Sequence, residues 1–218
     1  MRRLARCKMR RPLTSAGRLN NAMLPAGHIA KVNFTRQTTD SPRYHFFMQR
    51  PALTEIAPYF HGYLSLVPAG RLALILTAQG EATKAQLEKL TPKQADHRYA
   101  ADKWSVRQLV GHLIDTERIL CYRALCIARG ETTALPGFDE NAYVANGNFD
   151  RRSMSDLAAE LSSVRAASVT LILGIDSAAT ANIGTANGKP MSVRAICWVI
   201  AGHELHHRNI LRDRYGIG

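Results

Sequence analysis

Apolar side chains recur at helical spacing in four separate stretches of this chain. Steps of four and three residues place side chains on one face of an α-helix. The third stretch shows such steps at Leu157, Leu161, Val164, Ser168, Leu171 and Ile175. The four expected helices cover residues 71–90, 105–128, 153–175 and 192–214.

Capping signals support these helix boundaries. Ser105 and Gln108 have the spacing of a capping box, and Ser153 and Ser192 are suitable N-caps. No alternation of apolar and polar residues is long enough to predict a strand, and the TANGKP motif is expected to be a turn. The sequence therefore predicts an all-α four-helix bundle, which follows an irregular or briefly helical lead-in at residues 51–70.

Two histidines interrupt the apolar face of the fourth helix. That face carries Val193, Ile196, Ile200, His203, His207 and Ile210. A buried imidazole is unfavourable unless a polar group or an ion pairs with it. Two histidines at positions i and i+4 can instead bind one metal ion. His203 and His207 are therefore candidate metal ligands, and a third ligand has to come from elsewhere in the chain.

The third candidate ligand is His112, on the second helix. At about 1.5 Å per residue, His112 lies roughly 10 Å from the start of its helix, whereas His207 and His203 lie roughly 10 and 16 Å from the end of theirs. These depths agree only if the two helices are antiparallel. The long segment 131–152 can be a crossover that makes them so, in an up-down-down-up bundle.

The sequence resembles a known family at these residues. The segments KWSVRQLVGHLIDTERILCYRAL, LPGFDENAY, SVRA and AGHELHHRNILRDRY are similar to the DinB-like (DNA-damage-inducible) metalloprotein family. The resemblance covers roughly Ala52 to Tyr215. It implies an up-down-down-up bundle with a divalent metal held by one histidine of the second helix and an HxxxH pair of the fourth, here His112, His203 and His207. Some relatives are transferases or isomerases that use a small thiol as cosubstrate.

Three neutral imidazoles leave coordination positions open, which is typical of a catalytic metal site. Zn²⁺ and Ni²⁺ suit nitrogen ligands better than Fe²⁺ and Mn²⁺ do. We therefore expect a metal-dependent enzyme acting on a small molecule, as a thiol-dependent S-transferase or a hydrolase. The alternative is a non-catalytic bundle in which the ion only staples two helices. Phe138, Asp139 and Tyr143 of the crossover either form a wall or lid over the open face or pack on the end of the bundle.

The HELHH motif at residues 203–207 also satisfies HExxH, the zinc-protease motif, with Glu204 as the would-be base. We rank this interpretation third, because such proteases need a downstream third ligand and only eleven residues follow His207. On a helix, Glu204 points about 100° away from His203. A carboxylate that is solvated or paired with an arginine is therefore the preferred interpretation.

Several other residues have two interpretations. Asp115 either orients His112 or is a surface acid, and His206 either replaces His207 as a ligand or lies off the apolar face. Arg123 and Arg165 bind an anionic substrate or, as we prefer, form structural pairs. We expect His61 and His97 to lie on the surface or to be hydrogen-bonded to a partner. The remaining two histidines, His28 and His45, give no indication of a function.

The basic charge of the chain is concentrated at its start. The formal net charge is +12, but residues 1–47 carry ten basic residues and one acid, and the rest of the chain is nearly balanced with 19 basic and 16 acidic residues. We expect residues 1–47 to be a disordered extension, or an overlong gene start upstream of Met48; a transit peptide and a nucleic-acid arm are the alternatives. Residues 48–218 are expected to form the bundle domain.

Cysteine spacing, hydropathy and charge indicate the compartment and the partners of the protein. Cys7, Cys121, Cys126 and Cys197 show no CxxC spacing, so we expect reduced thiols and a cytoplasmic location. No apolar run approaches the ~18 residues that span a bilayer, and a membrane partner is not expected. The near-neutral charge of residues 48–218 argues against nucleic-acid binding through the folded domain. Exposed apolar faces of a bundle are compatible with a homodimer.

Overall fold

Four long helices form the body of the protein in the computed structural model, which describes residues 47–218. They are α2 (Leu72–Leu87), α4 (Val106–Ala128), α6 (Met154–Leu173) and α7 (Val193–Tyr215). Each of α4 and α6 packs against two long neighbours: α4 against α6 and α7, and α6 against α4 and α2. The predicted all-α four-helix bundle is confirmed. The expected extension lies outside the described residues, apart from Phe47.

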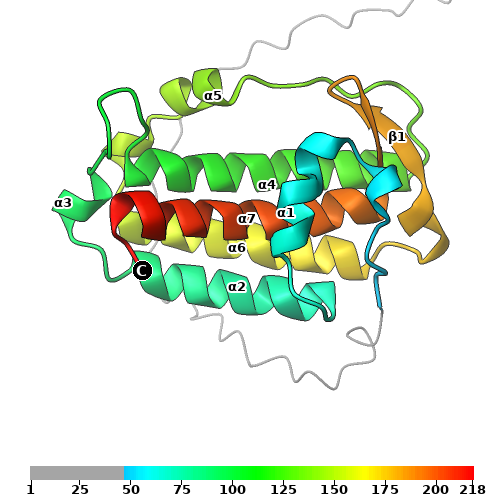
Figure 1. Cartoon of the computed structure of the whole chain (residues 1–218), viewed down its shortest axis with the longest axis horizontal. Helices are drawn as coiled ribbons and strands as arrows, with labels where there is room; N and C mark the ends of the chain where they lie inside the picture. Colours follow the sequence, from blue (N-terminus) through cyan, green and yellow to red (C-terminus); the bar gives the residue numbers. More distant parts are fainter. Residues whose placement is uncertain (1–46) are drawn as a thin grey trace, which may run out of the picture. The chain divides into compact units, whose positions relative to one another are not determined.

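The bundle has the up-down-down-up order (Figure 1). In the figure α2 and α7 run in one direction, and α4 and α6 run in the other. The connection from α4 to α6 crosses the whole length of the bundle, as the length of the 131–152 segment predicts. It contains the short helix α5 (Glu140–Asn146) and the 3-10 helix η4 (Phe149–Arg151).

The helix starts follow the capping signals of the sequence. The hydroxyl of Ser105 accepts a hydrogen bond from Gln108 N at 3.1 Å, and the Gln108 side chain accepts from Ser105 N at 3.1 Å. Ser153 accepts from Asp156 N, and Ser192 accepts from Ala195 N. Each serine satisfies a backbone N–H that has no partner inside its helix. At the other end of α7, Gly216 adopts φ of +67°, a left-handed conformation that suits glycine.

The expectation of no strand is wrong at one place. Strands β1 (Ile183–Ala186) and β2 (Lys189–Ser192) form an antiparallel hairpin in which Ile183 pairs with Ser192. The turn is Asn187–Gly188, with φ of +50° and +68°, a dipeptide that favours tight hairpins. Four-residue strands are too short to show alternation. The predicted turn is thus the tip of a hairpin.

Short elements close the ends and one side of the bundle. The 3-10 helices η2 (Leu53–Glu55) and η3 (Pro58–Phe60) lead into α1 (His61–Leu66), which packs on α7. Helix α3 (Pro92–Ala95) connects α2 to α4, and η5 (Ala178–Ala181) precedes the hairpin. No helix among residues 47–218 is long and apolar enough to cross a membrane.

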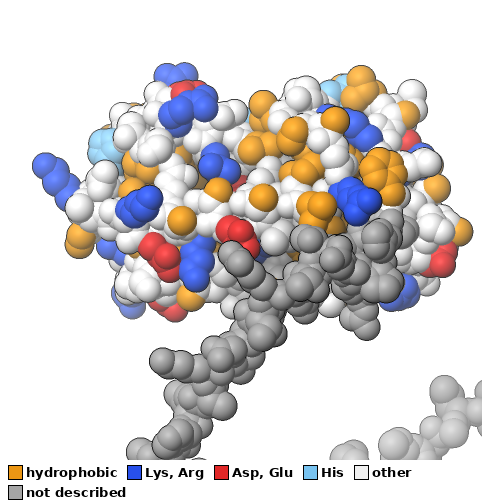
Figure 2. All heavy atoms as spheres, turned by 90° about the horizontal axis from the view of Figure 1, so that it is seen from below, with side chains coloured by type: hydrophobic (Ala, Val, Ile, Leu, Met, Phe, Trp, Pro, Cys, Tyr) orange, Lys and Arg blue, Asp and Glu red, His pale blue; other side chains and the backbone are white. Residues whose placement is uncertain are grey.

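Charged side chains of both signs lie on the described surface. In Figure 2, basic and acidic side chains are interspersed with apolar ones over the visible part of this face. Cys121, Cys126 and Cys197 are free, as expected, whereas Cys7 lies outside the described residues.

The start of α7 is tied to the lead-in by one carboxylate. Glu55 accepts hydrogen bonds from Arg194 Nε at 2.6 Å and Arg194 Nη2 at 2.8 Å, and from the hydroxyl of Ser192 at 2.7 Å. The hydrogen bonds from Arg194 are the main cause that lowers the pKa of Glu55 from 4.5 to about 2. This ion pair fixes the position of the helix that carries two of the candidate ligands.

Glu55→Gln should therefore destabilise the fold in a pH-dependent way. A carboxyl whose pKa is lowered in the folded state stabilises the fold above pH 4.5, and this contribution is lost as the pH falls towards 2. Because the carboxylate keeps some contact with solvent, we expect a cost of about 1–2 kcal/mol at pH 7. Urea unfolding of both proteins from pH 7 to pH 2 measures the difference, which should vanish at the acid end.

The exposed Glu88 provides the control for this prediction. It pairs with Lys84 at 3.7 Å across one helical turn. Glu88→Gln should change stability by less than about 0.5 kcal/mol at any pH. A cost for Glu55→Gln that stayed constant down to pH 2 would show that the ionised carboxylate is not the stabilising group.

Candidate metal centre

Three imidazoles from two helices meet inside the bundle. His203 Nε2 lies 3.1 Å from His112 Nε2 and 3.1 Å from His207 Nε2. One nitrogen of each ring lies within 4.8 Å of the other two. The structure therefore brings together the residues that the sequence predicts, because α4 and α7 are antiparallel and the three rings reach one level.

The three rings are almost completely shielded from water. His112 is 5% exposed, and His203 and His207 are each 8% exposed. Burial is the largest cause that lowers the pKa of His112 to about 4 and of His207 to about 3. Burial, followed by the neighbouring histidines, also lowers the pKa of His203 well below its usual value. The imidazoles are thus neutral near pH 7, which is the form that binds metals.

The spacing of the nitrogens fits a shared ion. Two nitrogens that each lie about 2.0–2.1 Å from one ion, at tetrahedral or octahedral angles, are about 2.8–3.4 Å apart. The two separations of 3.1 Å from His203 Nε2 fall in this interval. Among the described residues, Nδ1 of His207 is buried without a hydrogen-bond partner, so Nε2 makes the polar contact of this ring. The donor set thus supports a divalent metal.

Aromatic rings and one hydroxyl hold the imidazoles in place. Trp104 lies on His112 with ring centroids 4.8 Å apart, and Tyr63 of α1 lies edge-on to His203 at 5.7 Å. The hydroxyl of Thr116 is 3.4 Å from His112 Nδ1, one turn along α4. A partner on Nδ1 leaves Nε2 free to bind an ion. Thr116 is therefore the residue that can orient the ring of His112. Asp115, the residue that the sequence suggested for this role, lies 3.9 Å from Arg118.

Two glycines allow other segments to approach the histidines. Gly202 precedes His203, and a Cβ at this position would overlap the backbone carbonyl of Tyr63. Gly111 precedes His112, and a Cβ there would overlap the ring of Phe149. Helix interiors disfavour glycine, so a Gly-His pair inside each ligand helix is a signal that sequence reasoning missed.

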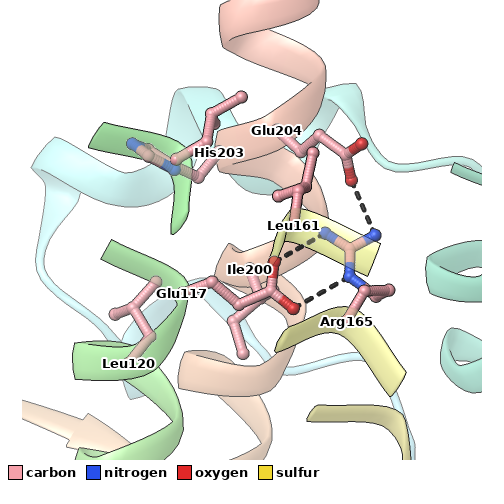
Figure 3. Close-up of a pocket in the computed structure, with 8 residues that line it drawn as sticks. Glu117, Leu120, Leu161, Arg165, Ile200, His203 and Glu204 are labelled. Carbon is pink, nitrogen blue, oxygen red and sulfur yellow. Dashed lines mark hydrogen bonds and ion pairs between the residues drawn. The ribbon is translucent and has the colours of Figure 1, made fainter. Parts of the chain in front are cut away.

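A buried charge cluster lies beside His203. Arg165 of α6 donates to both carboxylate oxygens of Glu117 on α4, at 2.9 and 2.8 Å, and to the backbone oxygen of Leu76 on α2 at 2.8 Å. Its Nη1 also forms an ion pair with Glu204 of α7 at 2.7 Å (Figure 3). The preferred interpretations are confirmed: Arg165 forms structural pairs, and Glu204 is a carboxylate paired with an arginine. A carboxylate held in this way is not free to act as the base of an HExxH protease.

The crossover residues have mainly structural contacts. Asp139 is the N-cap of α5 and accepts from Asn141 N at 2.9 Å. Phe138 packs against the ring of Tyr143 and under the guanidinium of Arg123, which also donates to Pro136 O at 2.8 Å. These contacts favour packing over a lid, and they confirm the structural interpretation of Arg123.

The other histidines are satisfied elsewhere. Nε2 of His61 lies 3.0 Å from Leu53 O, and His97 packs edge-on to Tyr215. His206 is half-buried against Tyr63, outside the cluster of three. His28 and His45 lie outside the described residues.

Fold and site define a class: an up-down-down-up four-helix bundle with three converging imidazoles. The sequence profile of the DinB superfamily matches residues 75–211, and the chain belongs to this family. A solved structure with a similar fold is YfiT from Bacillus subtilis, described as a probable metal-dependent hydrolase with an unusual four-helix bundle topology. The TM-score is 0.60 at 20% identity, over 67% of this chain and 87% of that chain. No curated protein matches the chain.

Gly202→Ala tests whether close packing of α1 on α7 supports the site. The added methyl group has to displace the backbone of α1, so we expect a loss of about 1–3 kcal/mol in the free energy of unfolding. Gly62→Ala on α1 is the matched control, because a Cβ at Gly62 meets nothing within 4 Å. Helix propensity predicts that this control is neutral or stabilising by about 0.5–1 kcal/mol. Equal stability of both variants would contradict the close approach.

Proposed function

We propose that this protein is a divalent-metal-dependent enzyme that acts on a small molecule, with His112, His203 and His207 as the metal ligands. The observation that carries this proposal is the convergence of three buried imidazoles, in which His203 Nε2 lies 3.1 Å from Nε2 of both His112 and His207. Three protein ligands leave coordination positions for water and substrate, as in catalytic sites and unlike closed structural sites. Zn²⁺ and Ni²⁺ suit this donor set best.

The residues of the site have separate tasks in this proposal. The three imidazoles would hold the ion. The ring of Trp104 packs on His112 and that of Tyr63 on His203, and these contacts orient the two imidazoles and cover one side of each. Thr116 keeps the Nδ1 side of His112 occupied, which directs Nε2 towards the ion. A bound divalent ion lowers the pKa of its water to about 7 or stabilises a thiolate, and so supplies the nucleophile.

Hydrolysis is the reaction class that we favour. Its support is the fold shared with YfiT, described as a probable metal-dependent hydrolase. Thiol-dependent S-transfer is the second candidate. Burial raises the pKa of Cys121 to about 11, and Cys197 is buried with a raised pKa as well, so neither thiol is suited to be a nucleophile. The thiol of such a reaction would come from a cosubstrate and not from Cys121 or Cys197.

Metal analysis tests the ligand set directly. Purified wild-type protein should contain about one divalent ion per chain, and His112→Ala and His207→Ala should each abolish stoichiometric binding. His97→Ala is the control, and His206→Ala should also retain the ion because its ring lies outside the cluster. Absence of an ion from the wild type, or full metal content in the two ligand variants, would refute the site.

Removal of the metal separates an enzyme from a bundle that is only stapled by its ion. At a free ion concentration 100 times the dissociation constant, binding should add about 2.7 kcal/mol to the free energy of unfolding. Chelation should remove this gain, and an enzyme should also lose turnover in a screen of ester, amide and thiol-plus-electrophile substrates. Stability that depends on metal, together with no metal-dependent turnover in the screen, would favour the stapled bundle.

A further inference from the structure

The charge cluster beside His203 contains more negative than positive charge. Arg165 is one guanidinium, whereas Glu117 and Glu204 are two carboxylates, so the ionised cluster has a formal charge of −1. All three residues are buried, with exposed fractions of 4%, 4% and 2%. A surplus charge in a protein interior is strongly unfavourable unless another charge compensates for it.

Hydrogen-bond geometry shows which carboxylate is the surplus one. Glu117 accepts two well-directed hydrogen bonds from Arg165, and the Nη1 group of Arg165 donates to the backbone oxygen of Leu76. Oε2 of Glu204 lies 2.7 Å from Nη1 but receives no well-directed hydrogen bond. Its other oxygen accepts a hydrogen bond from the hydroxyl of Thr83, which carries no charge. Arg165 is therefore mainly the partner of Glu117.

No second cation in the described part of the chain compensates Glu204. Among residues 47–218, the ion pair of the Glu204 carboxylate is the one with Arg165. Arg208 is one helical turn further along α7, yet it forms no ion pair with Glu204 there and instead lines a separate groove with Lys89. The negative charge of Glu204 thus requires a partner of another kind.

The surplus charge and one residue of the imidazole cluster border the same small cavity. Glu204 follows His203 in α7, and both line a cavity of about 10 Å³ together with Glu117 and Arg165 (Figure 3). That volume has room for about one water molecule, so little solvent can enter the cavity between Glu204 and His203. Three neutral imidazoles would leave the charge of a dication uncompensated, and opposite charges attract strongly in a water-poor interior.

We propose that Glu204 is an electrostatic partner of the metal ion, which stabilises the bound dication without coordinating it. In the metal-free protein, the negative charge of Glu204 is buried without a matching positive charge. In the metal-bound protein, the same negative charge compensates part of the charge of the ion. The inference rests on the proposed metal site. It assigns to Glu204 a role different from the base of a protease and different from a purely structural ion pair.

Glu204→Gln tests this proposal, because it removes the charge and keeps the shape of the side chain. Zn²⁺ and Co²⁺ affinities, measured by competition with a chelator, should fall roughly 10- to 100-fold. The metal-free variant should unfold at the same temperature as the metal-free wild type, or higher. A purely structural role predicts the opposite pair of results, with a less stable metal-free protein and an unchanged affinity.

Two matched controls separate the charge from the other contacts. Thr83→Val removes the hydrogen bond to Glu204 without changing any charge, and it should lower the stability of the metal-free protein while metal affinity changes less than about threefold. Glu88→Gln removes the same charge from an exposed position on α2, and it should leave both quantities unchanged.

The visible spectrum of the Co²⁺ protein completes the test, because it reports the number of ligands. An unchanged spectrum in Glu204→Gln, together with weaker binding, supports the proposal, since the three histidines then still hold the ion. Unchanged affinity in Glu204→Gln, or a metal-free variant that is less stable than wild type, would overturn it. A wild-type protein that binds neither ion would refute the proposed metal site and this inference together. A wild-type protein that binds both ions, with the same affinities as Glu204→Gln, would refute the inference alone.

Discussion

The antiparallel packing of α4 against α7 is the constraint on which the rest of the molecule depends. His112 lies about two turns from the start of α4, whereas His203 and His207 lie at the middle and in the second half of α7, so the rings meet only in this orientation. Antiparallel packing of the second and fourth long helices requires a crossover in a bundle of this order. The long connection from α4 to α6 is therefore a structural requirement of the site.

Around this pair, the interior of the bundle contains several buried polar side chains. A guanidinium, two carboxylates and three imidazoles are buried between the four long helices. Each of the four helices contributes to the contacts of Arg165 with Leu76, Glu117 and Glu204. Such a network is stable only when its groups are paired, and it favours one arrangement of the helices over others. The lead-in adds the ion pair between Glu55 and Arg194, which holds the start of α7.

In this arrangement, some residues surround the candidate metal site and others hold the crossover on the bundle. Tyr63 and Trp104 enclose the imidazoles, while the crossover is pinned to the bundle by Arg123 and to the hairpin by Leu135, whose N–H donates to Thr185 O at 2.8 Å. The rigid surroundings fit a preorganised metal site, in which the ligands do not have to reorganise when the ion binds. Membership of the DinB superfamily is consistent with a site of this kind.

The sequence by itself determined the elements that depend on local chemistry. Periodicity and serine caps located the four long helices to within a few residues, and helical depth together with loop length predicted the crossover and the three histidines. The hairpin was missed because two four-residue strands carry too little periodicity, although Asn187–Gly188 was recognised as a turn.

Only the tertiary structure decided which polar residues are partners. Thr116 and Asp115 are adjacent and equally plausible in sequence, yet the helix turns the hydroxyl towards His112 and the carboxylate towards Arg118. The contact of Gly202 with α1 and the meeting of Glu117, Arg165 and Glu204 join segments far apart in the chain. Such contacts depend on side-chain direction and helix packing, which no local pattern of residues encodes.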